Sequence, residues 1–174
     1  TSMPLHWGEV DGRTIDIYAK RRLALEQPSE GQMWFLHGGP GAGCSEQDRC
    51  FFDPEYFRIV LLDQRGSGRS KPVGDLTDNT MDDTADDIEQ LRKLLGIKSW
   101  HVFGGSYGST IAIHYAQTFP EACKSMVIRG IWLLRQEEIN WWLYQIGMIQ
   151  PELWREFAGF IPEDERHDLL EAYW

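Results

Sequence analysis

The sequence predicts an α/β protein with a mostly parallel sheet that is covered by helices on both faces. Short, nearly continuous apolar runs occur at residues 33–36, 57–62 and 100–104, and such runs are typical of strands buried on both sides. Each of these runs leads into a glycine-rich turn or loop. Helical patterns alternate with the later strands, which indicates parallel strand–helix–strand units.

The first predicted element is an N-terminal hairpin. Residues 5–10 and 13–20 flank the dipeptide Asp11-Gly12, which favours a tight turn because both turn positions need positive φ. Residues 23–32 then read as a loop that leads into the first buried strand.

Residues 80–95 form the clearest predicted helix. Thr80 can cap its amino terminus, and Asp83 stands at the third position of a near capping box. Acidic residues crowd its first turns and basic residues its last, which suits the helix dipole, and Gly96 ends it. A strand at 100–104, a helix at 109–119 and a strand at 125–131 follow.

The sequence changes character at about residue 135. Residues 135–174 are helical and aromatic, with no strand pattern. We therefore expect two parts: residues 1–134 as an α/β core, and residues 135–174 as the beginning of a helical layer.

Composition excludes several functional classes. The net charge of −10 argues against nucleic acid and anionic membranes as partners, since both are negatively charged and bind clusters of basic residues. The most apolar stretch, residues 125–134, is too short to cross a bilayer. The three cysteines are scattered and odd in number, and no signal peptide opens the chain, so the expected location is cytoplasmic. No metal or organic cofactor is expected.

Residues 104–108, Gly-Gly-Ser-Tyr-Gly, match the G-x-S-x-G motif of a nucleophile elbow. A serine on a sharp strand-to-helix turn needs small neighbours, and the following helix points its amino terminus at the site. The alternative is a serine that only caps the helix. The strand, motif and helix occur in the required order, which favours Ser106 as a nucleophile.

Two other glycine loops follow strands. Residues 37–41, His-Gly-Gly-Pro-Gly, fit a loop that supplies a second N–H to an oxyanion hole, although a plain tight turn is the alternative. Residues 63–70 contain G-x-G but lack the Lys-Ser/Thr pair of a phosphate-binding loop. A structural loop fixed by hydrogen bonds of Asp63 and Arg65 is the favoured interpretation.

Four segments together resemble the proline iminopeptidases, which are cytosolic enzymes of the α/β-hydrolase fold. The segments are "LHGGPGAGCS", "FDPEYFRIVLLDQRGSGRS", "HVFGGSYGSTIAIHYAQTFPE" and "VIRGIWLLRQEEINWW". The resemblance implies that Ser106 is the nucleophile and that the N–H groups of Gly39 and Tyr107 form the oxyanion hole. It also implies a substrate-binding set: Gly38, Arg129, Trp132 and Trp142. From the residues alone, the tryptophans are more often core than pocket.

No histidine fits the catalytic base. The fold orders its triad as serine, then acid, then histidine. The five histidines are His6, His37, His101, His114 and His167. The first three precede Ser106, His114 lies within the nucleophile helix, and His167 follows in a charged helix with no intervening strand. We therefore expect the acid and the base outside these 174 residues, and each histidine to be a surface or packing residue.

The predicted function is that of a serine exopeptidase that releases N-terminal proline from peptides, with the chain forming the N-terminal part of the fold. The C-terminal half of the same protein is then the expected partner, and the chain alone is expected to be inactive. Two alternatives stay open: another esterase or amidase of this fold, and a non-catalytic fragment or interaction module that lacks a complete triad. Peptide-length preference and oligomeric state do not follow from the sequence.

Overall fold

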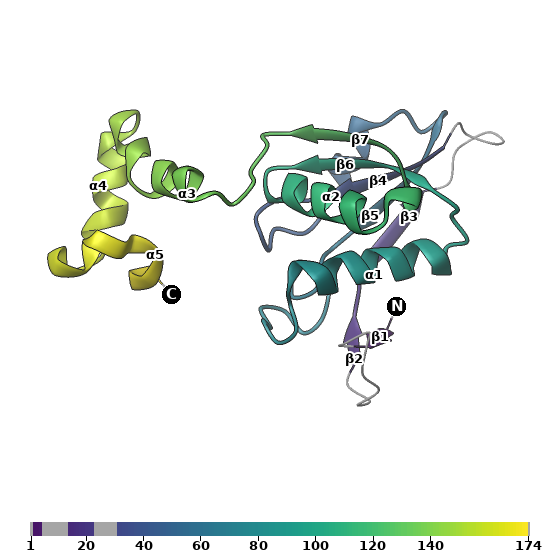
Figure 1. The fold of residues 1–174 in the computed structure, drawn as a ribbon, viewed down its shortest axis with the longest axis horizontal. Coiled ribbons are helices and arrows are strands. Elements are labelled where there is room, and N and C mark those ends of the chain that lie inside the picture. Colours follow the sequence, from purple (N-terminus) through teal and green to yellow (C-terminus); the bar gives the residue numbers. More distant parts are fainter. Residues whose placement is uncertain (1, 5–13, 23–30, 174) are drawn as a thin grey trace. The chain divides into compact units, whose positions relative to one another are not determined.

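A computed structural model describes residues 2–4, 14–22 and 31–173. It divides the chain into two units, Thr1–Ile131 and Trp132–Trp174. In the first unit, five strands form one sheet in the order β3-β5-β4-β6-β7. These are β3 (Ala19–Arg22), β4 (Gly31–Leu36), β5 (Phe57–Leu62), β6 (Trp100–Gly105) and β7 (Cys123–Arg129). All neighbours are parallel except β3 with β5, so the predicted mostly parallel sheet is confirmed (Figure 1).

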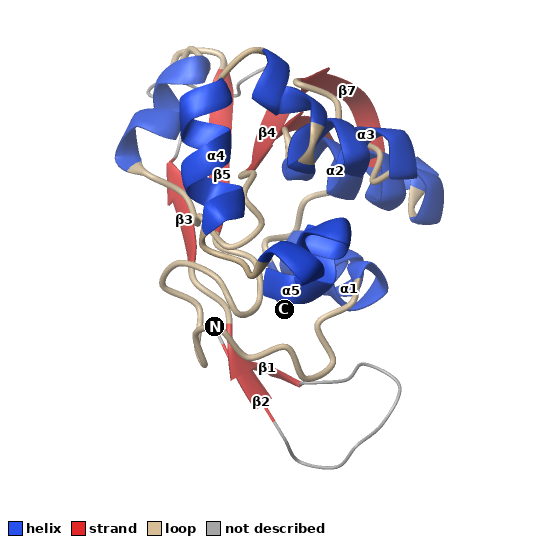
Figure 2. Ribbon diagram, turned by 90° about the vertical axis from the view of Figure 1, so that its left-hand side faces the viewer, coloured by secondary structure: helices blue, strands red, loops and turns tan. Residues whose placement is uncertain are grey.

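The N-terminal region differs in detail from the predicted hairpin. Strand β1 (Ser2–Pro4) pairs antiparallel with β2 (Thr14–Asp16), and this pair lies apart from the main sheet (Figure 2). The single strand expected at residues 13–20 is divided between β2 and β3, which belong to different sheets. The expected strand at 5–10 and the Asp11-Gly12 turn lie outside the described residues.

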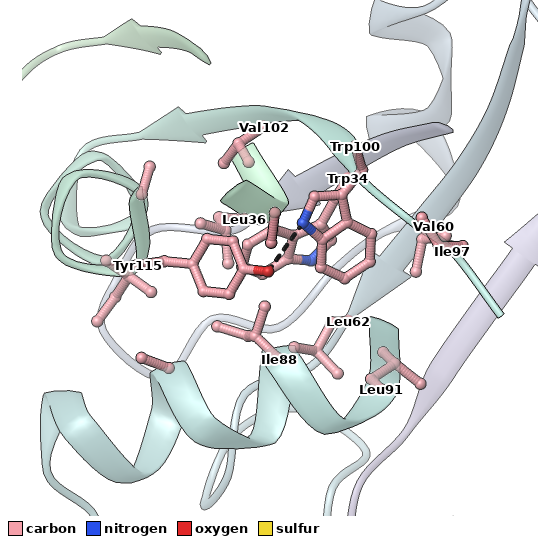
Figure 3. Close-up of a cluster of buried hydrophobic side chains, with 14 of the residues drawn as sticks. Trp34, Leu36, Val60, Leu62, Ile88, Leu91, Ile97, Trp100, Val102 and Tyr115 are labelled. Atoms are coloured by element: carbon pink, nitrogen blue, oxygen red, sulfur yellow. Dashed lines mark hydrogen bonds between the residues drawn. The ribbon is translucent and has the colours of Figure 1, made fainter. Parts of the chain in front are cut away.

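One face of the sheet packs against α1 (Met81–Leu94) and α2 (Tyr107–Thr118). Alternate residues of the strands supply this core: Trp34, Leu36, Val60, Leu62 and Val102. The ring of Trp34 stacks on Trp100 with centroids 4.9 Å apart and meets the edge of Tyr115 at 5.2 Å. Figure 3 shows the hydroxyl of Tyr115 accepting a hydrogen bond from the indole N–H of Trp100, at 3.2 Å. This core fixes the helix that follows Ser106.

The other face of the sheet is covered by a shorter element. Met33, Phe35, Ile59 and Leu61, which alternate with the residues of the first core, pack with Cys44 and Phe52. The 3-10 helix η1 (Glu46–Phe51) lies on this side, where the ring of its last residue stacks on Phe35 at 5.8 Å. Helices therefore lie on both faces, as expected, but within the described residues of the first unit the second face is packed by a 3-10 helix and by no α-helix.

Helix α1 begins as its capping pattern predicts. The hydroxyl of Thr80 accepts the N–H of Asp83 at 3.2 Å, and the carboxylate of Asp83 accepts the N–H of Thr80 at 3.0 Å. This reciprocal pair satisfies two of the N–H groups that a helix start leaves free. Gly96 follows the helix with φ of 67°, a conformation that glycine adopts without strain.

The second unit contains the remaining helices. They are α3 (Gln136–Leu143), η3 (Gln145–Met148), α4 (Pro151–Gly159), η4 (Glu163–Asp168) and α5 (Leu169–Tyr173). A small core of Ala158, Ile161 and Leu169 holds them together. The helical character expected from residue 135 is confirmed, while the unit itself begins three residues earlier, at Trp132. In the described part of the chain, no helix is long and apolar enough to cross a membrane.

A buried ion pair joins the 63–70 loop to α1. The guanidinium of Arg65 donates to both carboxylate oxygens of Asp87, at 2.8 and 2.7 Å, and both side chains are buried. Replacing Asp87 with alanine leaves a buried cation without its main partner, and we expect the free energy of unfolding to fall by about 3–5 kcal/mol. Urea unfolding followed by tryptophan fluorescence measures the loss. Glu46→Ala, which removes an exposed pair with Lys20, is the control and should cause no measurable loss.

Candidate active site

Ser106 stands alone between β6 and α2, with φ of 54° and ψ of −128°. Few residues with a Cβ adopt positive φ, and such strain persists only where the surroundings impose it. Here the N–H of Ser106 donates to the carbonyl of Arg129 at 3.1 Å, and its own carbonyl accepts from the N–H and the hydroxyl of Ser109 at 2.8 and 2.6 Å. The serine is exposed, so its hydroxyl can meet a substrate.

The glycines of the motif are required by close contacts. A Cβ on Gly104 would lie 3.0 Å from the Cβ of Ala112 and would collide with the carbonyl of Gly108. A Cβ on Gly108 would come within 2.8 Å of the carbonyl of His37. Any larger residue would therefore push α2 away from the sheet and from the loop after β4.

The strain at Ser106 leads to a prediction about stability. Glycine adopts positive φ without the penalty that a Cβ brings. Ser106→Gly should therefore give a higher melting temperature than Ser106→Ala, by the equivalent of about 1 kcal/mol in the free energy of unfolding. Equal melting temperatures for the two variants, measured by calorimetry, would show that the turn is relaxed.

The loop after β4 packs directly on the elbow. A Cβ on Gly38 would lie 2.9 Å from the carbonyl oxygen of Gly105, 3.0 Å from the Cβ of Ser106 and 3.6 Å from its hydroxyl oxygen. The following residue, Gly39, has φ of 116°, which only glycine adopts readily. Residues expected to flank a reacting carbonyl are thus brought together by the ends of β4 and β6.

His37 fixes this loop. One of its ring nitrogens, Nε2, accepts the N–H of Gln64 at 3.1 Å, so the proton of the neutral ring is assigned to Nδ1, which then donates to the carbonyl of Gly38 at 2.8 Å. The N–H of Gly43 also faces Nδ1, at 3.2 Å, and the carbonyl of Gly38 is the closer partner. Burial lowers the pKa of His37, although the hydrogen bond to Gly38 and the charges of Asp63 and Asp48 act in the opposite direction. The ring is therefore neutral, and His37 is a packing residue, as the sequence predicts. Its hydrogen bonds hold the backbone of the loop after β4, and it does not act as a proton carrier.

Asp63 fixes the far end of the same loop. Its carboxylate accepts the N–H of Cys44 at 2.7 Å, and the N–H and guanidinium of Arg69 at 2.9 and 2.8 Å. Burial raises the pKa of Asp63, but these hydrogen bonds outweigh burial, so that the net pKa is lowered. Burial, together with the charge of Asp63, raises the pKa of the Cys44 thiol to about 12, so this thiol stays protonated. The 63–70 loop is structural, as its sequence predicts.

The residues expected to bind substrate are divided between the two units. Arg129 ends β7, and its guanidinium lies beside Gly105, where a Cβ would be 3.3 Å from Nε, and 5.9 Å from the ring centre of Phe51. Trp132 and Trp142 belong to the second unit. The side chain of Trp142 is 60 % exposed, so it is not part of that unit's small core. The roles of these three residues stay predictions.

The described histidines other than His37 have partners of their own. The ring of His101 is 2.6 Å from the hydroxyl of Ser125, His114 is 2.8 Å from Asp82, and His167 is 2.7 Å from the carbonyl of Asp164. His6 lies outside the described residues. Among the described residues of the first unit, no hydrogen bond joins a histidine to Ser106.

The α/β-hydrolase fold family model matches residues 33–174. The chain belongs to the α/β-hydrolase fold family. Two similar curated proteins are proline iminopeptidases. The one from Xylella fastidiosa is 50 % identical over an alignment that covers 87 % of this chain and 50 % of the relative. The one from Arabidopsis thaliana is 50 % identical over an alignment that covers 84 % of this chain and 39 % of the relative. This α/β hydrolase thus spans about half the length of the curated relatives it matches.

Solved structures agree on the fold. An α/β hydrolase from a deep-sea metagenome library superposes with a TM-score of 0.61 over 84 % of this chain and 50 % of its own, at 23 % identity. A proline iminopeptidase-related protein from Thermus thermophilus superposes with a TM-score of 0.57 over 74 % of this chain and 42 % of its own, at 27 % identity. The elbow and the loop after β4 therefore belong to an α/β-hydrolase fold.

Proposed function

We propose that this chain is the N-terminal part of a serine exopeptidase that releases N-terminal proline from peptides. The observation that carries the proposal is the strained, exposed Ser106 packed against Gly38 of the loop after β4. The identity of 50 % with proline iminopeptidases supports the choice of substrate. We further propose that the helices from residue 135 onward are the start of a helical cap, which the rest of the protein completes.

The chemistry follows from the positions of these groups. The hydroxyl of Ser106 attacks the carbonyl carbon of the N-terminal prolyl residue, and the N–H groups of Gly39 and Tyr107 bind the oxyanion. Tyr107 is the first residue of α2, so its N–H has no acceptor within the helix. A histidine outside this chain takes the serine proton and gives it to the leaving amine. Water then hydrolyses the prolyl ester of Ser106 and releases proline.

The three cysteines are free thiols, which supports the proposed cytoplasmic location. A panel of substrates tests the assignment with the full-length enzyme. We expect prolyl anilides to be cleaved faster than alanyl anilides and simple esters. Faster cleavage of esters would instead support an esterase of the same fold, and failure of Ser106 to react with a fluorophosphonate in the full-length protein would support a non-catalytic module.

Trp142 provides a test of the pocket. We propose that Trp132 and Trp142 bind the prolyl ring, because they match pocket positions of the family and Trp142 is exposed on its unit. Trp142→Ala should raise KM for a prolyl anilide about tenfold or more, since it removes a large apolar contact, while the melting temperature changes little. The control is Phe160→Ala, which removes an aromatic ring that is 85 % exposed in the same unit. Normal kinetics with a large fall in melting temperature would make Trp142 a packing residue.

A further inference from the structure

Gln64 contacts the loop after β4 through two hydrogen bonds to one residue. It follows the end of β5 and is buried. Its N–H donates to Nε2 of His37 at 3.1 Å, and its side-chain amide donates to the carbonyl of His37, also at 3.1 Å. Main chain and side chain of Gln64 thus hold both the ring and the backbone of the residue that precedes Gly38 and Gly39.

The contact is close to the reacting atoms but does not touch them. His37 links Gln64 to Gly38, because its Nδ1–H donates to the carbonyl of Gly38 at 2.8 Å. That carbonyl belongs to the same peptide group as the N–H of Gly39, so the bond orients the proposed oxyanion donor directly. Gly38 in turn packs on Ser106, as described above.

The residues on either side of Gln64 make it a rigid support. Asp63 is held by Arg69 and by the N–H of Cys44, and Arg65 is held by Asp87 of α1. A buried residue between two buried, ion-paired neighbours has little freedom to move. The loop after β4 is therefore fixed to the buried 63–70 loop.

We infer that Gln64 is a positioning residue that sets the orientation of the Gly38–Gly39 peptide group through His37. The inference rests on the proposed function, because the peptide group matters only if its N–H binds an oxyanion. Oxyanion donors act over about 2.7–3.1 Å, and loss of one donor costs about 100- to 1000-fold in kcat. A displaced donor should cost less than a lost one, so we expect a smaller fall in kcat with an unchanged KM.

The test compares two buried or half-buried carboxamides of the same region in the full-length enzyme. Gln64→Met removes the side-chain donor to His37 and keeps the main-chain bond. Asn79→Leu is the control, because its amide donates to the carbonyl of Asp75 at 3.0 Å and to the carbonyl of Arg65 at 3.5 Å, so the change removes a carboxamide that contacts the 63–70 loop and leaves both bonds of Gln64 to His37 in place. Gln64→Met should lower kcat about 10- to 100-fold with KM within about twofold, whereas Asn79→Leu should leave both within about twofold.

Further measurements keep the result decisive. Gln64→Leu also lacks the donor, without adding a titratable group, and should reproduce the loss, in case the methionine variant folds poorly. The amide NMR shifts of Gly39 should move in the Gln64 variants but not in Asn79→Leu, and this readout needs no turnover. Equal kcat values and unmoved Gly39 shifts in all variants overturn the inference. If the enzyme cleaves only esters, the prolyl assignment fails, yet the same kcat loss measured on an ester still supports the positioning role.

Discussion

Replacing Ser106 with alanine in the full-length enzyme is expected to lower the turnover of a prolyl anilide by about 10⁶-fold, the scale seen when a serine nucleophile is removed. The variant loses the attacking oxygen while the turn that holds it, including the bond from the N–H to the carbonyl of Arg129, can still form. The melting temperature should therefore change little. Steady-state kinetics and calorimetry on the same preparation measure both effects.

Ser109→Ala is the matched control for that experiment. It removes a hydroxyl from the same turn, one that donates to the carbonyl of Ser106 at 2.6 Å but is not proposed to react. We expect it to retain at least about a tenth of the wild-type kcat, because it affects only the position of the elbow. A Ser106→Ala enzyme that keeps more than a few per cent of its activity would overturn the assignment of the nucleophile.

Residues 1–174 expressed alone are expected to self-associate. Strand β7 is last in the sheet order and pairs with β6 on one side. Met126 and Val127 on this strand are 38 % and 53 % exposed, although both are apolar. An apolar edge strand with free N–H and C=O groups invites pairing with another chain.

Sedimentation velocity tests this expectation. Wild-type 1–174 should form oligomers whose fraction grows with concentration, and Val127→Lys should reduce that fraction, because a charge on an edge strand opposes strand addition. Gln117→Lys, which adds the same single positive charge at an exposed position of α2, outside β7, is the control for net charge. A concentration-independent monomer for the wild-type chain would show that the edge of β7 is tolerated.

Local patterns in the sequence predict most of the framework. The helix from Thr80 was predictable because its capping pair is three residues apart, and the elbow at Ser106 because the strand, glycines and helix are contiguous. The division of residues 13–20 between β2 and β3 was not predictable, since it depends on which sheet each half joins. Likewise, the sequence did not predict that the connection between β4 and β5 would form the 3-10 helix η1.

The long-range contacts of the candidate site could not be predicted from the sequence. Gln64 and His37 are separated by 27 positions, and nothing in either segment alone indicates that they are bonded. The only signal was that both residues come within two positions of the end of a buried strand, and the carboxyl ends of parallel strands meet at one edge of the sheet. The hydrogen bonds of Asp63 and Arg65 were predictable in kind, because charged residues in a buried loop need partners, but their acceptors and donors were not.

The turnover of a prolyl anilide by residues 1–174 alone, compared with the full-length enzyme at equal concentration, tests the central claim most directly. We propose that this chain supplies the nucleophile and the oxyanion hole but not the base, so the hydroxyl of Ser106 stays protonated and weakly nucleophilic. The account predicts no turnover above background for 1–174, and Ser106-dependent turnover for the full-length enzyme. Turnover of 1–174 at enzymatic rates that is lost in His167→Ala would contradict it, because the base would then lie within these 174 residues.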